Sequence, residues 1–210
     1  MQSPRFVGLF ESEIAPMETS EFVLEQYNTV RGIVDDLFLK GLTDDQFRFQ
    51  PKEGLNSIAW YMWHTARWQD VANTLIVPDS KQILDEHWVA RMNVSRRDVG
   101  TGMTRQECSE CNETVNVTEL RAYWKAVGEA VRNVARSLPS EDLRTPVDRA
   151  QLYRMLEDGT IANEQAKWVP AFLEGKSRGW FLSMAVWHMA EHLLGGVVCV
   201  RRVSGIPVGL

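Results

Sequence analysis

Three of the four histidines lie in apolar segments, at spacings that suit a shared metal ion. His188 and His192 are four residues apart, a separation that places both imidazoles on one face of a helix, one turn from each other. Two imidazoles in this arrangement can donate nitrogen lone pairs to one divalent cation. His64 lies in a second apolar segment and supplies a third imidazole if the two segments pack together. We therefore predict a three-histidine metal site with a position left open for water or a substrate.

Two other interpretations of these histidines remain open. Each imidazole could instead be a core side chain whose nitrogen is satisfied by a backbone carbonyl or a tyrosine. Residues 188–192 also spell H-x-x-E-H, the inverted zinc-protease motif, in which Glu191 would be the general base. That class uses an acidic third ligand well downstream, and residues 193–210 contain no Asp or Glu. The sequence therefore favours a three-histidine site over a protease.

Other polar side chains are secondary candidates. Glu191 and Tyr61 could contact the ligands or handle protons, because each lies close to a predicted ligand along its helix. His87 lies in an irregular connection, and we expect it to be a surface or packing residue. Cys108 and Cys111 form a C-x-x-C pair, which could be half of a zinc site or a redox pair. No second C-x-x-C occurs in the sequence, and the surrounding residues predict a capped helical turn, so we expect a structural role for this pair.

The composition is that of an ordinary globular protein and disfavours two classes of partner. The chain has 210 residues, of which 44% are hydrophobic and 24% are charged. Its net charge of -5 disfavours binding to a phosphate backbone, so we expect no nucleic-acid partner. The most apolar stretch, residues 180–200, contains two histidines, a glutamate and a Gly-Gly pair. It therefore does not predict a membrane span.

The start of the chain and the cysteine content favour the cytoplasm. Residues 1–16 carry charges and prolines in place of the continuous apolar core of a signal peptide. Three cysteines are too few for a disulfide framework, and the odd number leaves at least one unpaired. This usage agrees with a reducing compartment. We expect a cytoplasmic protein that acts on a small-molecule substrate and has no membrane partner.

Four long helices must position the histidines. Apolar residues recur at alternating steps of three and four, as in an amphipathic helix, over Ser20–Lys40 and Leu120–Leu138. Ser57–Ile76 and Gly179–Arg201 are apolar on most sides and predict central helices. Residues 77–115 and 145–175 are broken by prolines, glycines and charges, and predict connections with short helical pieces. The fold class is therefore all-α, a four-helix bundle with short accessory helices, formed by residues 18–210 after an N-terminal extension over residues 1–17.

Three segments resemble the DinB-like superfamily, which includes bacillithiol and mycothiol S-transferases and the mycothiol-dependent maleylpyruvate isomerase. They are residues 56–64, residues 88–104 and residues 187–196. The resemblance extends from about Phe22 to Gly205. Its most specific element is one histidine on the second helix followed, far downstream, by H-x-x-x-H on the last.

The resemblance implies a metal-dependent activity. It implies a four-helix bundle that binds a divalent metal, often zinc or nickel, through His64, His188 and His192, and that frequently forms a homodimer. Members with assigned activities mostly use the metal to activate a low-molecular-weight thiol or to polarise its electrophilic partner. We therefore expect a metal-dependent thiol S-transferase or isomerase-like enzyme, with such a thiol as co-substrate. The alternative is a non-catalytic, stress-associated protein that binds a metal or a small ligand, because no residue stands out as a dedicated general base.

Overall fold

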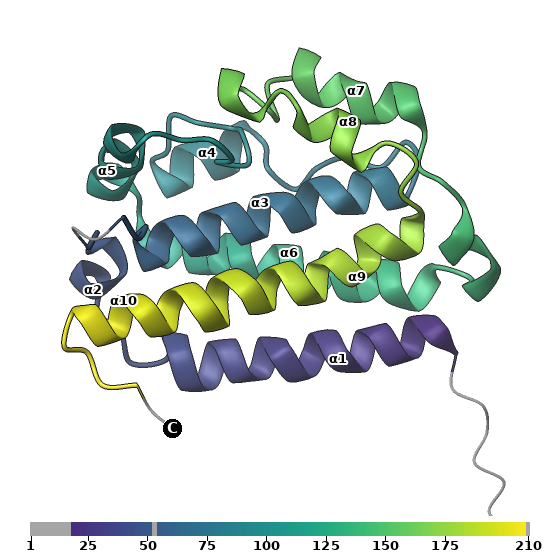
Figure 1. The fold of residues 1–210 in the computed structure, drawn as a ribbon. Helices are drawn as coiled ribbons and strands as arrows, with labels where there is room; N and C mark the ends of the chain where they lie inside the picture. The colour runs from purple at the N-terminus through teal and green to yellow at the C-terminus, as the bar shows by residue number, and fades with distance from the viewer. Residues whose placement is uncertain (1–17, 52–53, 209–210) are drawn as a thin grey trace, which may run out of the picture.

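Four long helices form the frame of the computed structural model, which describes residues 18–51 and 54–208 (Figure 1). Two of them contain a π-helical turn, η1 and η4, in which the backbone is locally widened. The four are α1 (Thr19–Ile33) with η1 (Val34–Leu39); α3 (Ile58–Ile76); α6 (Val117–Ser137); and α9 (Arg178–Met189) with η4 (Ala190–Gly196) and α10 (Val197–Val203). The predicted all-α bundle is confirmed, and each predicted long helix lies within a few residues of its observed bounds.

Local capping explains where three of the long helices begin. The Ser57 hydroxyl accepts a hydrogen bond from the backbone N–H of Trp60 at the start of α3, and Ser177 does the same for Trp180 at the start of α9. Both contacts satisfy a backbone donor that the first helical turn leaves free. Asn116 caps α6 by accepting from the backbone N–H of Glu119.

The helix α3 is the centre of the bundle. It packs against α6 on one side and α9 on the other, and α1 closes the ring by contacting both α6 and α9. In Figure 1, α3 and α9 run side by side, with α1 along the opposite edge of α9. Almost every side chain of α3 is buried, which is the expected result for a helix that is apolar on most sides.

Short helices cover the face of α3 that the other long helices leave open. In Figure 1, α4, α7 and α8 lie over this face. The short helices are α2 (Asp44–Arg48), α4 (Glu86–Met92), α5 (Arg105–Thr114), η2 (Ser140–Arg144), α7 (Arg149–Glu157), η3 (Glu164–Ala166) and α8 (Val169–Leu173). Within the described ranges β-pairing is limited to one isolated bridge between Pro146 and Ser177. The connections predicted over residues 77–115 and 145–175 therefore contain short helices, as expected.

A buried ionic cluster joins α3 to the connection that follows it. Arg67 and Asp70 form an ion pair of 2.9 Å, and each is 1% exposed. The Tyr123 hydroxyl of α6 donates to the same Asp70 carboxylate at 2.7 Å. The remaining acceptor capacity of Asp70 is used by the backbone N–H groups of Ile83 and Leu84. Two helices and one connection are thus held by a single carboxylate, whose hydrogen bonds compensate its burial.

The last long helix is unusually apolar. By length and composition alone, Arg178–Val203 would qualify as a membrane span, with a window of mean hydropathy 1.2. Phe181, Ala185 and Met189 of this helix are buried against neighbouring helices, and 33% of the window is buried in total. The predicted N-terminal extension, residues 1–17, lies outside the described residues.

Candidate metal centre

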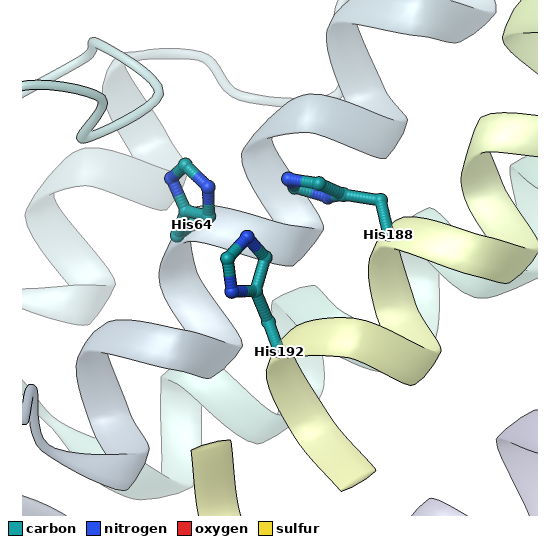
Figure 2. A group of neighbouring side chains, drawn as sticks. All are labelled: His64, His188 and His192. Atoms are coloured by element: carbon teal, nitrogen blue, oxygen red, sulfur yellow. The ribbon is translucent and has the colours of Figure 1, made fainter. Parts of the chain in front are cut away.

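The three predicted histidines point toward one another between α3 and the α9–η4 helix (Figure 2). The ring centroids of His64 and His188 are 5.0 Å apart, those of His64 and His192 are 4.9 Å apart, and those of His188 and His192 are 4.5 Å apart. One ring nitrogen from each residue lies within 4.8 Å of the other two. Residues more than 120 positions apart in the chain are therefore assembled into one group of three nitrogen donors.

A single backbone hydrogen bond orients His64. Its Nδ1 lies 2.6 Å from the carbonyl oxygen of Val99. Because a carbonyl can only accept, the proton is on Nδ1, and the lone pair of Nε2 is left for a ligand. Val99 is itself held, since its N–H donates to the carbonyl of Thr160 at 3.0 Å. The connection between α4 and α5 thereby sets both the tautomer and the direction of this imidazole.

A glycine allows that connection to approach the histidine. Gly100 has φ +77°, a left-handed backbone conformation that residues other than glycine rarely adopt. Its N–H donates to Asp98 Oδ1 at 2.7 Å. A Cβ at this position would lie 3.4 Å from Trp60 Nε1 and 3.7 Å from His64 Nδ1. The Trp60 indole stacks on His64 with ring centroids 4.6 Å apart and planes at 10°. His64, which is 5% exposed, is therefore enclosed by a tryptophan and a tight backbone turn.

The second and third histidines lie where the last long helix changes character. His188 is in the final turn of α9, and His192 is in the π-helical segment η4. π-Helical turns inside α-helices are frequent at functional sites, because the extra residue changes the direction of the side chains that follow. The Tyr61 ring packs against His192, with centroids 5.9 Å apart and planes at 24°. It also lies against Gly196, where a Cβ would come within 2.7 Å of Tyr61 Cζ.

Burial keeps all three imidazoles neutral. It lowers the pKa of His64 from 6.5 to about 3, with a further contribution from His192 and an opposing one from the Val99 carbonyl. It also lowers the pKa of His188 to about 2, helped by the other two histidines. The pKa of His192 is lowered by burial as well, and the negative charge of Glu191 opposes that shift. Neutral imidazoles carry the lone pairs that a metal needs, whereas three unpaired imidazoles would be a costly core.

The donor set fits a divalent transition metal. Neutral nitrogen ligands suit zinc, nickel, copper and iron better than magnesium or calcium, which prefer oxygen. Two nitrogens on one tetrahedral zinc ion lie ~3.4 Å apart at the usual Zn–N length of ~2.1 Å. The nitrogens of the three histidines lie within 4.8 Å of one another, so the imidazoles would have to turn toward the ion to reach that spacing. In the described parts of the chain no carboxylate or thiolate joins this group, so three protein ligands would leave a position open.

The secondary candidates take distinct places. Tyr61 is buried at 8% exposure behind His192, and burial raises the pKa of its hydroxyl, so its contact with the histidine is one of packing. Glu191 is exposed, and within the described contacts it forms no hydrogen bond to an imidazole. His87 is exposed on α4, as expected of a surface residue.

The C-x-x-C pair lies in an ordinary helix. Cys108 is buried and Cys111 half-buried on α5, which begins with a capping box between Thr104 and Glu107. Burial raises the pKa of the Cys108 thiol to about 11 and raises that of Cys111 as well. Both thiols are therefore protonated near neutral pH, which opposes a role as a nucleophile. Among the described residues, neither thiol belongs to a group of three or more potential metal ligands. The structural role expected for the pair agrees with this placement.

The groups that sequence reasoning missed are a backbone carbonyl and a stacking ring. The Val99 carbonyl has no side-chain signal, since every residue has one, and only the tertiary fold brings it to His64. Trp60 lies one helical turn before His64 in the sequence, but its stacking on the imidazole depends on the side-chain conformations that packing selects.

Several open cavities, of about 400 to about 710 Å³, lie away from the histidines. One of about 400 Å³ is lined by Thr74, Asp79, Gln151 and Arg154, between α3 and α7. Its wall mixes acidic, basic and amide groups without a convergent set of ligands. The buried, preorganised histidines are therefore the better candidate for the functional site.

These features define a class of protein. It is an all-helical bundle with a candidate three-histidine metal centre between two of its long helices. The chain belongs to the DinB superfamily, whose sequence model matches residues 26–194. No curated protein matches the chain. A crystal structure of a conserved protein from Enterococcus faecalis is similar, with a TM-score of 0.65 and 19% sequence identity, over 90% of this chain and 99% of that one. At this identity the similarity supports the shared fold alone.

Proposed function

We propose that His64, His188 and His192 bind one divalent metal ion, zinc or nickel, and that the protein is a metal-dependent thiol S-transferase or isomerase-like enzyme. The observation that carries the proposal is the convergence of three neutral imidazole nitrogens within 4.8 Å of one another. A bound divalent metal would supply Lewis acidity, lowering the pKa of a coordinated thiol so that its anion forms near neutral pH.

The chain's own residues preorganise this centre. The Val99 carbonyl holds the Nδ1 proton of His64 and directs Nε2 toward the other histidines. Trp60 and the turn at Gly100 exclude water from one side of the group. Tyr61 supports His192 from behind. Rigid ligands with a fixed tautomer are what a catalytic metal site requires, because reorganisation of the ligands would otherwise oppose binding.

Besides the metal centre, the proposed transfer needs one group on the protein that accepts the thiol proton. The thiol loses its proton, its sulfur forms a bond to an electrophilic carbon, and the leaving group departs with the electron pair of the broken bond. Glu191, exposed beside His188 and His192, is the carboxylate closest in sequence to these ligands and is our proposed acceptor for the thiol proton. Within the described contacts, Glu191 forms no hydrogen bond to either imidazole. Because no contact holds this carboxylate at the centre, the observation favours the second candidate, a non-catalytic protein that binds a metal or small ligand.

Metal content tests the centre. Protein prepared without a histidine tag should contain about one zinc or nickel ion per chain, as three ligands on one ion require. His188→Ala and His192→Ala should lose the metal, and His87→Ala should keep it, because His87 is exposed on α4 outside the cluster. Elemental analysis of the four proteins measures this. Equal, negligible metal in the wild type and in His188→Ala would exclude both candidate functions.

Turnover then separates enzyme from binding protein. Low-molecular-weight thiols, including cysteine, coenzyme A and bacillithiol, should react with 1-chloro-2,4-dinitrobenzene faster in the presence of the metal-loaded wild type than of His64→Ala. A metal-loaded wild type that does not exceed the variant with any thiol would favour the non-catalytic candidate.

A further inference from the structure

Four aromatic side chains form a continuous path from α8 along α9 to the histidine cluster. We call Trp168, Phe172, Trp180 and Trp187 the aromatic strip. Successive ring centroids in this order are 5.7 Å, 6.4 Å and 5.7 Å apart. The strip ends at the cluster, where the Trp187 ring meets the edge of His188 with centroids 5.8 Å apart and planes at 90°.

The strip faces solvent to an extent that the fold does not explain. Trp168 is 58% exposed, Phe172 is 55% exposed and Trp187 is 43% exposed. Large aromatic side chains usually contribute to cores and interfaces, and several exposed together mark a binding surface. Trp180 and Trp187 are seven residues apart on α9, so they share one face of that helix.

That face borders the open side of the histidine cluster. Trp187 precedes His188 by one residue, which places it about 100° around the helix. The opposite neighbours of His188 on the helix surface, Ala185 and Met189, are buried. His64 is covered by Trp60 and the Gly100 turn, whereas His188 and His192 remain partly exposed. The open side of the cluster is therefore that of His188 and His192, where Trp187 contacts His188.

The size of the strip favours a small molecule over a second protein. Aromatic side chains bring roughly 150–250 Å² each. With about half of three rings exposed, the strip offers on the order of 300 Å², well below the ~800 Å² that each partner of a stable protein interface buries. A planar molecule with one or two rings can cover that area while its reactive end lies at the histidines.

We propose that the aromatic strip binds the electrophilic substrate and that this substrate is a planar aromatic or conjugated molecule. The proposal rests on the metal-dependent function proposed above. Stacking on the exposed ring of Trp187, against which the half-buried Trp180 packs, holds the flat part of the molecule, and the path of rings leads its reactive end to the three imidazoles. The strip thereby sets specificity, while the histidines carry the chemistry.

Two hydroxamate probes test the strip without knowledge of the substrate. Acetohydroxamate and benzohydroxamate share one metal-chelating group and differ in the aromatic ring. Zinc-loaded wild-type protein should bind benzohydroxamate at least about tenfold more tightly than acetohydroxamate in calorimetric titration. In Trp187→Leu and Trp180→Leu this ratio should fall toward one. Phe49→Leu should retain it, since Phe49 is a comparably exposed aromatic residue (47%) beyond α2 that does not belong to the strip.

The outcomes separate the two proposals. Equal affinity for both probes in the wild type would overturn the role of the strip and leave the metal centre intact. An unchanged ratio in the two strip variants, together with a loss of self-association in sedimentation experiments, would instead identify the strip as an interface between copies. Failure of the zinc-loaded protein to bind either hydroxamate would count against an open metal site, and with it the function on which this inference rests.

Discussion

At the scale of single residues, the contact between Gly196 and Tyr61 links the packing of the bundle to the candidate ligands. The Tyr61 ring lies between the backbone of η4 and the imidazole of His192. A side chain at position 196 would occupy the same space as this ring. The position therefore requires glycine for close approach of two elements, although its backbone angles are helical.

Gly196→Ala should destabilise the protein by about 1–3 kcal/mol, the usual effect of overpacking a core. It should also weaken metal binding, because displacement of Tyr61 removes the support behind His192. Urea denaturation and zinc titration measure the two effects. The matched control is Gly195→Ala, where an added Cβ has no neighbour within 4 Å. Equal stability of the two variants would show that the ring moves aside without penalty.

At the scale of elements, the connection between α3 and α5 is anchored to α3 and contacts the candidate metal centre. The Asp70 carboxylate binds its first residues through the backbone N–H groups of Ile83 and Leu84. Further along, the same connection presents the Val99 carbonyl to His64. Loops that orient ligands need such anchors, since their own backbone has few partners.

Asp70→Ala should destabilise the protein by about 3–5 kcal/mol, because it leaves the buried Arg67 guanidinium without its carboxylate. Thermal and urea denaturation measure the loss. Glu174→Ala is the comparison, since it removes an ion pair with Arg149 on the surface and should change stability little. The prediction is wrong if the two variants unfold at the same urea concentration.

At the scale of the whole molecule, the neutral histidines couple folding to pH. Their pKa values are lowered in the folded state, to about 3 for His64 and about 2 for His188. The histidines of the unfolded chain have ordinary pKa values near 6.5. Between pH 6.5 and the lower pKa values of the folded state, the unfolded chain therefore binds more protons than the folded protein. Stability of the metal-free protein falls as pH decreases through 6.5 and continues to fall until the folded pKa values are reached.

For His64 alone, the free energy of unfolding should be about 1.4 kcal/mol lower at pH 5.5 than at alkaline pH, since pH 5.5 lies one unit below the pKa of the unfolded state. Urea denaturation of metal-free protein between pH 8 and pH 5 measures the summed effect of the three histidines. His188→Gln should show a weaker pH dependence, and His87→Gln should match the wild type. Parallel curves for the wild type and His188→Gln would exclude a buried neutral His188.

The bundle and the histidine pair follow from local sequence. Helix positions depend on apolar spacing within each segment and on capping residues at its start, which is why residues 57–76 and 179–201 were predicted close to their observed bounds. The separation of four between His188 and His192 places both rings on one face within a single turn. These interactions join residues a few positions apart, so the sequence contains them directly.

Contacts between distant segments depend on the tertiary structure. Asn116 caps α6 through a local hydrogen bond, whereas the side chain of Glu119 pairs with Arg91 of α4, a contact between distant segments. The register of α3 against α9 decides whether His64 meets the other imidazoles, and the connection after α4 decides which carbonyl fixes its tautomer. Such choices result from the packing of all side chains at once. Local sequence patterns therefore predicted the candidate histidines, and only the tertiary structure placed them within 4.8 Å of one another.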